Sequence, residues 1–245
     1  TLDVSPSDVL TSATFDYKQM AGNVTISGLE QIQNSGTEAI INLLESRIGV
    51  LEKTMANTLS TSLYSDGTGS DGKEVGGLQL LVADAGTGTV GGINSSTFTF
   101  FQNVQTTATS SAFSTTNIQA DMNTIYLSLV RGSDSPDLIM ADTNAYKSFL
   151  GSLQAIQRVT SDRVATSGFT SVQYLNSDVI FDDACPTNKM YFLNTDYLRL
   201  EVAANRNFVP GEAKMSVNQD AMVTPMFWSG NLTCSNRALQ GVIHT

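Results

Sequence analysis

The segment Gly67–Glu74, GTGSDGKE, is the strongest candidate for chemistry in this sequence. It fits the phosphate-binding pattern G-x-x-x-x-G-K-[ST] except at the last position, where Glu74 replaces the hydroxyl that binds magnesium. Such a loop also follows a strand and opens a helix, so that the helix N-terminus faces the phosphate. Here a helical pattern precedes the loop and two glycines follow it. An enzyme or nucleotide-binding domain that uses the Gly67–Lys73 loop is therefore a disfavoured alternative.

Other residues of catalytic type lack the spacing that catalysis or metal binding needs. Asp66 and Asp71 of the same loop could bind calcium, but they do not have the ligand spacing of an EF-hand. The single histidine, His244, is the penultimate residue of the sequence, and no G-x-S-x-G nucleophile motif is present. Asp182 and Asp183 are adjacent, so on a strand they would point to opposite faces, and we expect a surface loop pair. We predict no catalytic, cofactor-binding or metal-binding residues.

Cysteine content and charge narrow the function further. Cys185 and Cys234 lack CxxC spacing, and a zinc site needs about four ligands, so we predict that both are small core residues. The chain carries 13 Lys and Arg against 23 Asp and Glu, a net charge of −10. Nucleic-acid-binding surfaces are usually basic, which this composition does not support. The sequence contains no apolar run of about 18 residues, so it predicts no membrane-spanning helix.

One long helix is the clearest element that the sequence predicts. Ser35–Glu38 has the form of a capping box, and apolar residues then recur in steps of three and four from Ile40 to Leu63. Asp66-Gly67 provides the stop signal. The pattern predicts a helix over residues 37–64, which at 1.5 Å per residue is roughly 40 Å long.

The N-terminal region is predicted to be extended. Residues 13–18 alternate apolar with polar side chains, and residues 24–26 repeat the pattern. No segment upstream offers a pairing partner, and soluble monomers usually avoid a long exposed strand edge. We therefore expect that the partner strand has been removed or that this segment lies on another subunit.

The rest of the chain predicts an α+β fold. Residues 65–92 are expected to form a loop or loose hairpin around the apolar segment Leu78–Val82, and Thr116 with Gln119 could form a capping box. Further helices are predicted near 116–130 and 143–155, and strands at 137–141, 172–175, 179–181, 190–193, 198–202 and in a last stretch that ends at Cys234.

Several blocks resemble the major capsid proteins of tailed bacteriophages. They are Leu2–Val9, Val24–Gln31, Glu52–Met55, Leu63–Gly69 and Trp228–Asn236, in that order along the chain. The resemblance implies the Hong Kong 97-type capsid fold, with a long spine helix, a peripheral-domain sheet and an axial domain. It also places an N-terminal arm and a further strand before Thr1, so we expect this chain to be a processed product or a fragment.

The resemblance implies a division of the chain into four parts. Residues 1–35 would be the returning arm of an extended loop that reaches over a neighbouring subunit. Residues 36–112 would form the peripheral domain with the spine helix, and residues 113–200 the axial domain. Residues 201–245 would return to the peripheral domain and its long sheet.

The implied function is a structural subunit of an icosahedral capsid. Its pentamers and hexamers would enclose the DNA genome without binding it specifically, in the virion, after synthesis in the host cytoplasm. Phe15, Tyr17 and Lys18 are the candidate residues for contacts between subunits. The implied partners are other copies of the chain, with a scaffolding protein, a portal and a maturation protease as further candidates, and no membrane. An encapsulin-type shell protein, which encloses an enzyme cargo, is the alternative.

Overall fold

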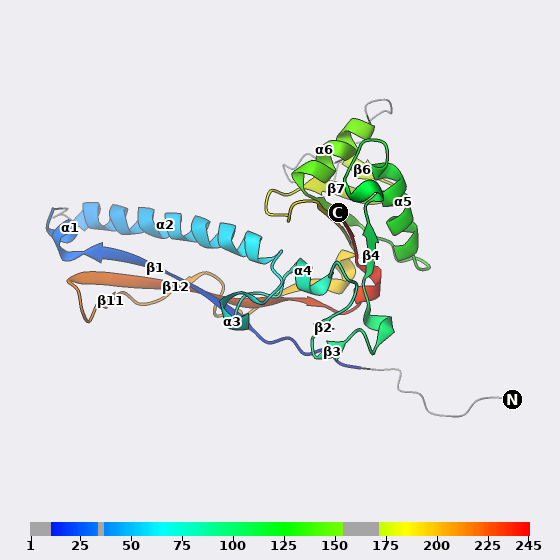
Figure 1. Cartoon of the computed structure of the whole chain (residues 1–245). Coiled ribbons are helices and arrows are strands. Elements are labelled where there is room, and N and C mark those ends of the chain that lie inside the picture. Colours follow the sequence, from blue (N-terminus) through cyan, green and yellow to red (C-terminus); the bar gives the residue numbers. More distant parts are fainter. Residues whose placement is uncertain (1–10, 34–36, 154–171) are drawn as a thin grey trace.

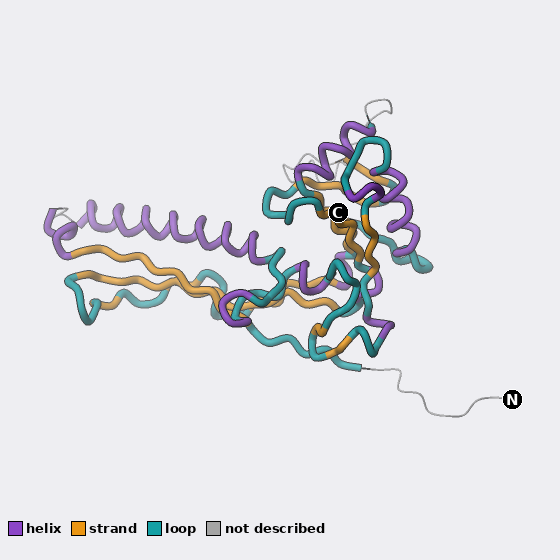
Figure 2. Tube along the Cα trace, in the orientation of Figure 1, coloured by secondary structure: helices purple, strands orange, loops and turns teal. Residues whose placement is uncertain are grey.

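A computed structural model describes residues 11–33, 37–153 and 172–245 of the chain. Figure 1 shows two parts: an elongated arm built from one helix on a long pair of strands, and a second domain at the base of the arm. The tube in Figure 2 follows the helix of the arm alongside its strands. Helices, strands and loops all contribute, which confirms the predicted α+β class.

The long helix of the arm is α2 (Thr37–Ser62), which spans 26 residues. At 1.5 Å per residue its length is about 39 Å. It confirms the predicted helix over 37–64 and ends two residues earlier, where the Leu63 and Tyr64 amides bond back to Leu59 and Thr61. The predicted capping box begins at residues that lie outside the described part of the chain. A short helix, α1 (Gly28–Gln33), precedes α2.

Strand β1 (Lys18–Ser27) pairs antiparallel along its whole length with β12 (Ala221–Cys234), from Lys18 opposite Gly230 to Ser27 opposite Ala221. The expectation that the N-terminal strand has no partner in this chain was therefore wrong. Its partner comes from near the other end of the sequence, and residue alternation carries no information on such distant pairing.

Three short strands pair with the second edge of β12: β9 (Leu198–Val202), β10 (Val209–Pro210) and β11 (Lys214–Met215). Pro225 lies in the middle of β12, where a missing N–H would normally break a ladder. It is tolerated because no strand pairs with this edge of β12 at Pro225: β10 ends with Pro210 opposite Met226, and β11 begins with Lys214 opposite Val223. The Pro225 carbonyl still accepts a 2.7 Å hydrogen bond from the Gly211 amide.

The second domain contains a six-stranded sheet in the order β4-β13-β8-β5-β7-β6. Its strands are β4 (Val104–Thr107), β5 (Leu138–Ala141), β6 (Val172–Tyr174), β7 (Ser177–Phe181), β8 (Lys189–Leu193) and β13 (Gly241–His244). Of the residues 201–245 that were expected to return to the long sheet, β12 lies in that sheet, and β13 lies between β4 and β8 in the six-stranded sheet. The division into four parts stays a prediction.

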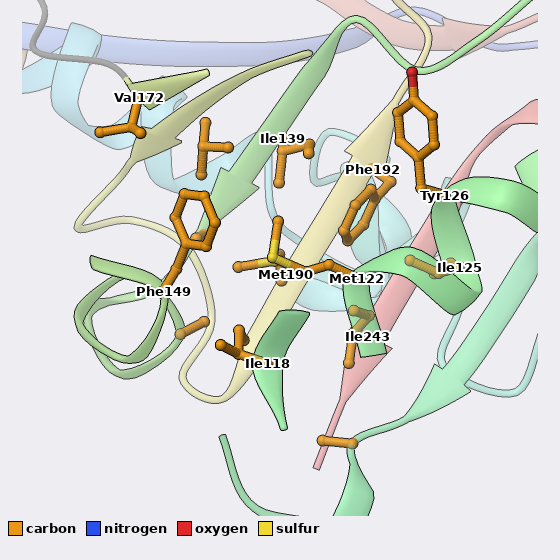
Figure 3. Packing of buried hydrophobic residues seen from close by; sticks show 14 of the residues in the cluster. Ile118, Met122, Ile125, Tyr126, Ile139, Phe149, Val172, Met190, Phe192 and Ile243 are labelled. Atoms are coloured by element: carbon orange, nitrogen blue, oxygen red, sulfur yellow. The ribbon is translucent and has the colours of Figure 1, made fainter. Parts of the chain in front are cut away.

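Two helices pack on one face of this sheet: α5 (Ile118–Leu129) and α6 (Thr143–Ser152). The predicted apolar stripe of α5 is fully buried, and Figure 3 shows Ile118, Met122 and Ile125 with Phe149 and Met190 in this core. Residues on the other face, including Tyr191 and Val242, belong to a second core that covers the base of the arm.

The N-terminal cap of α5 in this domain differs from the one that the sequence predicted. Asp142 caps α6 by accepting a 2.8 Å hydrogen bond from the Ala145 amide. The predicted capping box of Thr116 and Gln119 does not form. Asn117 occupies the N-cap of α5 without a side-chain bond, and the Gln119 amide donates instead to Ser152 on α6.

The segment between α2 and β4 is compact. Leu78–Val82 was expected in a loop or loose hairpin, but Leu78–Leu81 forms a short helix, α4, whose apolar residues are in the second core. The rest of the segment contains α3 (Gly69–Gly72), β2 (Thr89–Val90) and β3 (Ile93–Asn94). Short 3₁₀ helices cover Thr99–Phe101, Thr109–Ser111, Thr195–Tyr197 and Arg237–Leu239.

Candidate assembly surface

The arm leaves much of its helix uncovered. Between Leu44 and Ser62, Met55 is the one apolar side chain of α2 that is fully buried, and Val50 is 65% exposed. Met55 packs with Val75, Met226 and Trp228 in a small core. Helices in proteins gain most of their stability from packing of their apolar face. A helix of this length with so little covered surface is typical of a chain that packs against other molecules.

The far end of the arm carries exposed apolar side chains. Leu29 and Ile32 of α1 are exposed, as are Met215 of β11 and Val217, which is 98% exposed. The Gly28 amide donates to the Asp220 carbonyl at 2.9 Å, so α1 and the turn after β11 are adjacent, at the same end of the arm in Figure 1. Exposed apolar patches on a protein surface often mark contacts with partners.

An ion pair connects α1, α2 and β1. One Arg47 guanidinium nitrogen lies 2.7 Å from Glu30 Oε1, and the other donates to Glu30 Oε2 at 3.1 Å and to the Thr25 carbonyl at 2.6 Å. Glu30 Oε2 also accepts from the Ser27 amide at 3.1 Å. The hydrogen bond from Arg47, followed by that from Ser27, lowers the pKa of Glu30. Both groups therefore stay charged at neutral pH.

The base of the arm is fixed to the second domain. The Tyr64 hydroxyl donates to Asp182 Oδ2 at 2.6 Å, and the Leu78 amide donates to the Leu63 carbonyl at 2.7 Å. Burial, and then the hydrogen bond to Asp182, raise the pKa of Tyr64. An apolar cavity of about 200 Å³ lies here; its lining includes Leu63, Leu138 and Leu232.

The structure places the three predicted contact residues in different environments. Phe15 packs against the second core of its own chain, and the Lys18 ammonium donates to the Gly72 carbonyl at 2.6 Å. Tyr17 is 65% exposed. A role for Phe15, Tyr17 and Lys18 between subunits stays a prediction, and Tyr17 is the one whose side chain is largely available for it.

The glycine loop does not form a phosphate cradle. Ser70 and Asp71 both have left-handed backbone conformations, with φ of 51° and 55°. Asp66 accepts hydrogen bonds from the Thr68 amide and hydroxyl, which lower its pKa. A side-chain oxygen of Glu74 lies close to Gly69. Asp66 and Thr68 therefore bond to each other, and the Gly72 carbonyl accepts from Lys18, so these groups do not converge on a ligand.

The two cysteines and the Asp182–Asp183 pair were the remaining candidates for chemistry, and their burial and contacts indicate structural roles. Both cysteines are buried and free, as predicted, and burial raises the pKa of the Cys185 thiol to about 12 and that of Cys234 to about 11. Asp183 is exposed, whereas Asp182 is half-buried against Tyr64, so the expected surface pair is only partly correct. In the described residues, no group of three His, Cys, Asp or Glu side chains could hold a metal, and no helix is long and apolar enough to span a membrane.

The sequence patterns did not identify Arg47 or the buried Arg237. Arg237 is fully buried and donates to the Leu81 and Phe101 carbonyls, Ser95 and Asn103. Its partners come from segments far upstream, so no local spacing could have revealed them. The same holds for Arg47, whose partner Glu30 lies on a separate helix.

Known proteins share this arrangement in structure rather than in sequence. No protein-family model and no curated protein matches the sequence. The cyanophage A-1(L) capsid matches with a TM-score of 0.72 at 16% identity, over 94% of this chain and 76% of that chain. The capsid of Myoviridae phage XM1 matches with a TM-score of 0.63 at 10% identity, over 100% and 81%. The chain has the Hong Kong 97-type capsid fold.

The Hong Kong 97-type fold is also found outside phages. The SrpI encapsulin of Synechococcus elongatus matches with a TM-score of 0.65 at 11% identity, over 93% of this chain and 73% of that chain. Within the Hong Kong 97-type fold, α2 and the β1–β12 pair form the arm, and the six-stranded sheet forms the second domain.

Proposed function

We propose that this chain is a structural subunit of the icosahedral capsid of a tailed bacteriophage and that it has no enzymatic activity. Copies would assemble into pentamers and hexamers that enclose the DNA genome without specific binding. The match in fold to phage capsids over 94% and 100% of the chain supports this function. The net charge of −10 fits a protein that encloses DNA rather than one that grips it.

The observation that carries the proposal is the uncovered arm. An isolated subunit leaves Val50 on α2 and the apolar side chains at the tip, Leu29, Ile32, Met215 and Val217, in water. Contacts between copies would remove this surface from water at roughly 25 cal/mol per Å² of apolar area. A shell supplies such contacts to every copy.

From the proposed capsid function we assign a role to each part of the chain. Residues 1–35 would belong to a loop that reaches a neighbouring subunit, with Tyr17 in the contact. Residues 36–112 and 201–245 would contribute the peripheral domain, and residues 113–200, which include α5 and α6, would be the axial domain. Other copies of the chain are the principal partner, and a scaffolding protein, a portal and a maturation protease are the further proposed partners. The proposed location is the virion, after synthesis in the host cytoplasm.

An encapsulin-type shell protein is the second candidate, because the SrpI encapsulin has the same fold. The two functions differ in what the shell encloses. Particles purified from the native host would contain genomic DNA in the first case and a protein cargo in the second. Nuclease-protected DNA of uniform length in the particles would favour the phage capsid, and a stoichiometric enzyme without DNA would favour the encapsulin.

Expression of the complete gene product tests the proposal. We expect electron microscopy to show capsomers or closed shells over some range of salt and protein concentration, with a scaffold supplied if needed. A population that stays monomeric under all of these conditions would contradict it.

A further inference from the structure

The apolar cavity of about 200 Å³ lies where the arm meets the second domain. From the arm, its lining includes Leu63 and Tyr64 at the end of α2 and Leu232 of β12. From the second domain, it includes Leu138 and Met140 of β5. A molecule that fills this junction cavity would therefore contact the arm and the second domain at once.

Leucine side chains make up most of the wall of the junction cavity. Leu78 of α4 and Leu193 of β8 are 5% and 3% exposed, whereas Leu63, Leu138 and Leu232 are half-buried. The half-buried leucines leave apolar surface in contact with solvent at the cavity. A ligand that covers this surface gains from the removal of apolar area from water.

The buried polar groups of the lining already have partners. The Tyr64 hydroxyl donates to Asp182 Oδ2 at 2.6 Å, and Asp182 Oδ1 accepts from the Ala184 amide at 2.9 Å. Among the described lining residues, no buried side-chain nitrogen or oxygen lacks a hydrogen-bond partner. A buried water needs two to four polar partners, so the cavity offers water a poor site.

Charge disfavours an ionic ligand. Asp182 is the charged residue of the described lining, and it would repel an anion such as a carboxylate. A cation would lose its water of hydration against the leucine walls, which is costly. The hydroxyl and amide of Thr195 donate to Asp137, and Ser60 is exposed, so neither provides a buried polar anchor.

The size of the junction cavity limits the ligand to a small molecule. Pockets for drug-sized ligands have volumes of about 300–1,000 Å³. An apolar protein cavity of about 150 Å³ is large enough to bind benzene. The junction cavity, at about 200 Å³, therefore suits a single ring.

We propose that the junction cavity binds small, uncharged, apolar molecules of about the size of one aromatic ring. The bound ring contacts Leu138 of the second domain and Leu232 of the arm, and it stabilises the folded subunit against unfolding. The proposal does not depend on the capsid function, because the walls of the cavity belong to a single chain.

Titration of benzene into dispersed subunits with isotope-labelled leucine methyl groups tests the site on the wild-type chain. We expect saturable shifts of the Leu63, Leu138 and Leu232 methyl signals in the NMR spectrum. The methyl signals of Leu127, which is 71% exposed on α5, should stay unchanged. Cavity leucines that show no saturable shift, or a shift of equal size at Leu127, would overturn the proposal.

The same spectra distinguish benzene from another copy of the chain as the occupant. Methyl shifts at the cavity that follow protein concentration in the absence of benzene would show that a side chain of a second copy fills the space. That result would also overturn the proposal.

Leu232→Trp places a larger ring at the cavity and should abolish the effect of benzene. Leu127→Trp is the matched control, because it makes the same substitution at an exposed position outside the lining. At a benzene concentration ten times the dissociation constant from the titration, the ratio of folded to unfolded chain should rise about elevenfold. Urea unfolding with and without benzene measures this ratio.

The wild type and Leu127→Trp should both show this increase, and Leu232→Trp should show none. Equal stabilisation of both variants would place benzene elsewhere and overturn the proposal. If Leu232→Trp does not fold, the methyl titration of the wild type decides.

Discussion

Tyr64, just beyond the end of α2, donates a 2.6 Å hydrogen bond to Asp182, which follows the last residue of β7. The two residues come from the arm and from the second domain, so this bond ties the orientation of one part to the other. Around it, Tyr64 packs with Tyr191 at a ring-centroid distance of 6.2 Å. The junction is therefore a built contact rather than a loose linker.

Removal of the Tyr64 hydroxyl should weaken the junction. Tyr64→Phe removes a buried hydroxyl that donates to the half-buried Asp182 carboxylate, and loss of such a hydrogen bond typically costs about 1–3 kcal/mol. Urea unfolding measures the change in the free energy of unfolding. Tyr197→Phe is the control, since it also removes a hydroxyl-to-aspartate bond, but at a more exposed position, and should cost less. Equal losses would contradict the role of the junction.

Stability should fall at alkaline pH. Burial raises the pKa of Cys185 to about 12 from an ordinary value near 9, so the folded state holds this proton more tightly than the unfolded state does. The stabilisation is complete below about pH 9 and is lost progressively as pH rises toward 12. Urea unfolding at pH 8 and pH 10 should show a smaller decrease for Cys185→Ala than for the wild type. A decrease of the same size in both would contradict the assignment to Cys185.

Substitution by alanine should change the free energy of unfolding in opposite directions at two glycines, Gly77 and Gly49. A Cβ on Gly77 would lie 2.5 Å from the Leu63 carbonyl oxygen and the Ser65 amide nitrogen, which are backbone atoms that cannot turn aside. Overpacking of this kind costs about 1–3 kcal/mol or more. Gly49, inside α2, has nothing within 4 Å of its Cβ position, so alanine there should stabilise by about 1 kcal/mol. Thermal unfolding of Gly77→Ala and Gly49→Ala measures both; an unchanged Gly77→Ala would contradict the close approach.

Arg237 should tolerate no apolar replacement. Its guanidinium donates to four groups around it, at 2.6 Å to the Leu81 carbonyl and 2.9 Å to Asn103. Arg237→Met would remove this donor from the buried Leu81 and Phe101 carbonyls, at a cost of about 1–3 kcal/mol each, whereas Asn103 Oδ1 would keep the Ala83 amide as a donor. We expect no soluble folded protein, measured by circular dichroism and gel filtration. Asn103→Ala removes one of the partners and should give a folded but less stable chain. A stable Arg237→Met protein would contradict this account.

The sequence predicted the elements whose signal is local. Helix α2, helix α6 and strand β9 are where apolar periodicity and turn residues placed them, because these patterns report on the immediate neighbours of each residue. Resemblance in a few blocks was enough to predict the fold class. The short helix α4 was missed because a four-residue segment with three leucines fits a strand or a helix equally well.

Distant pairing lay beyond the sequence patterns. The partner of β1, the insertion of β13 between β4 and β8, and the contacts of Arg47 and Arg237 all join segments far apart in the chain. Nothing in residue spacing encodes which strand reaches which edge. The candidate contact residues Phe15 and Lys18 show the same limit, since their partners in the same subunit could not be foreseen.

Electron microscopy of the complete gene product, purified over a range of salt and protein concentrations with any scaffold supplied, tests the central claim most directly. The capsid function predicts pentamers, hexamers or closed shells of uniform diameter. Particles of a single subunit under every condition would contradict it.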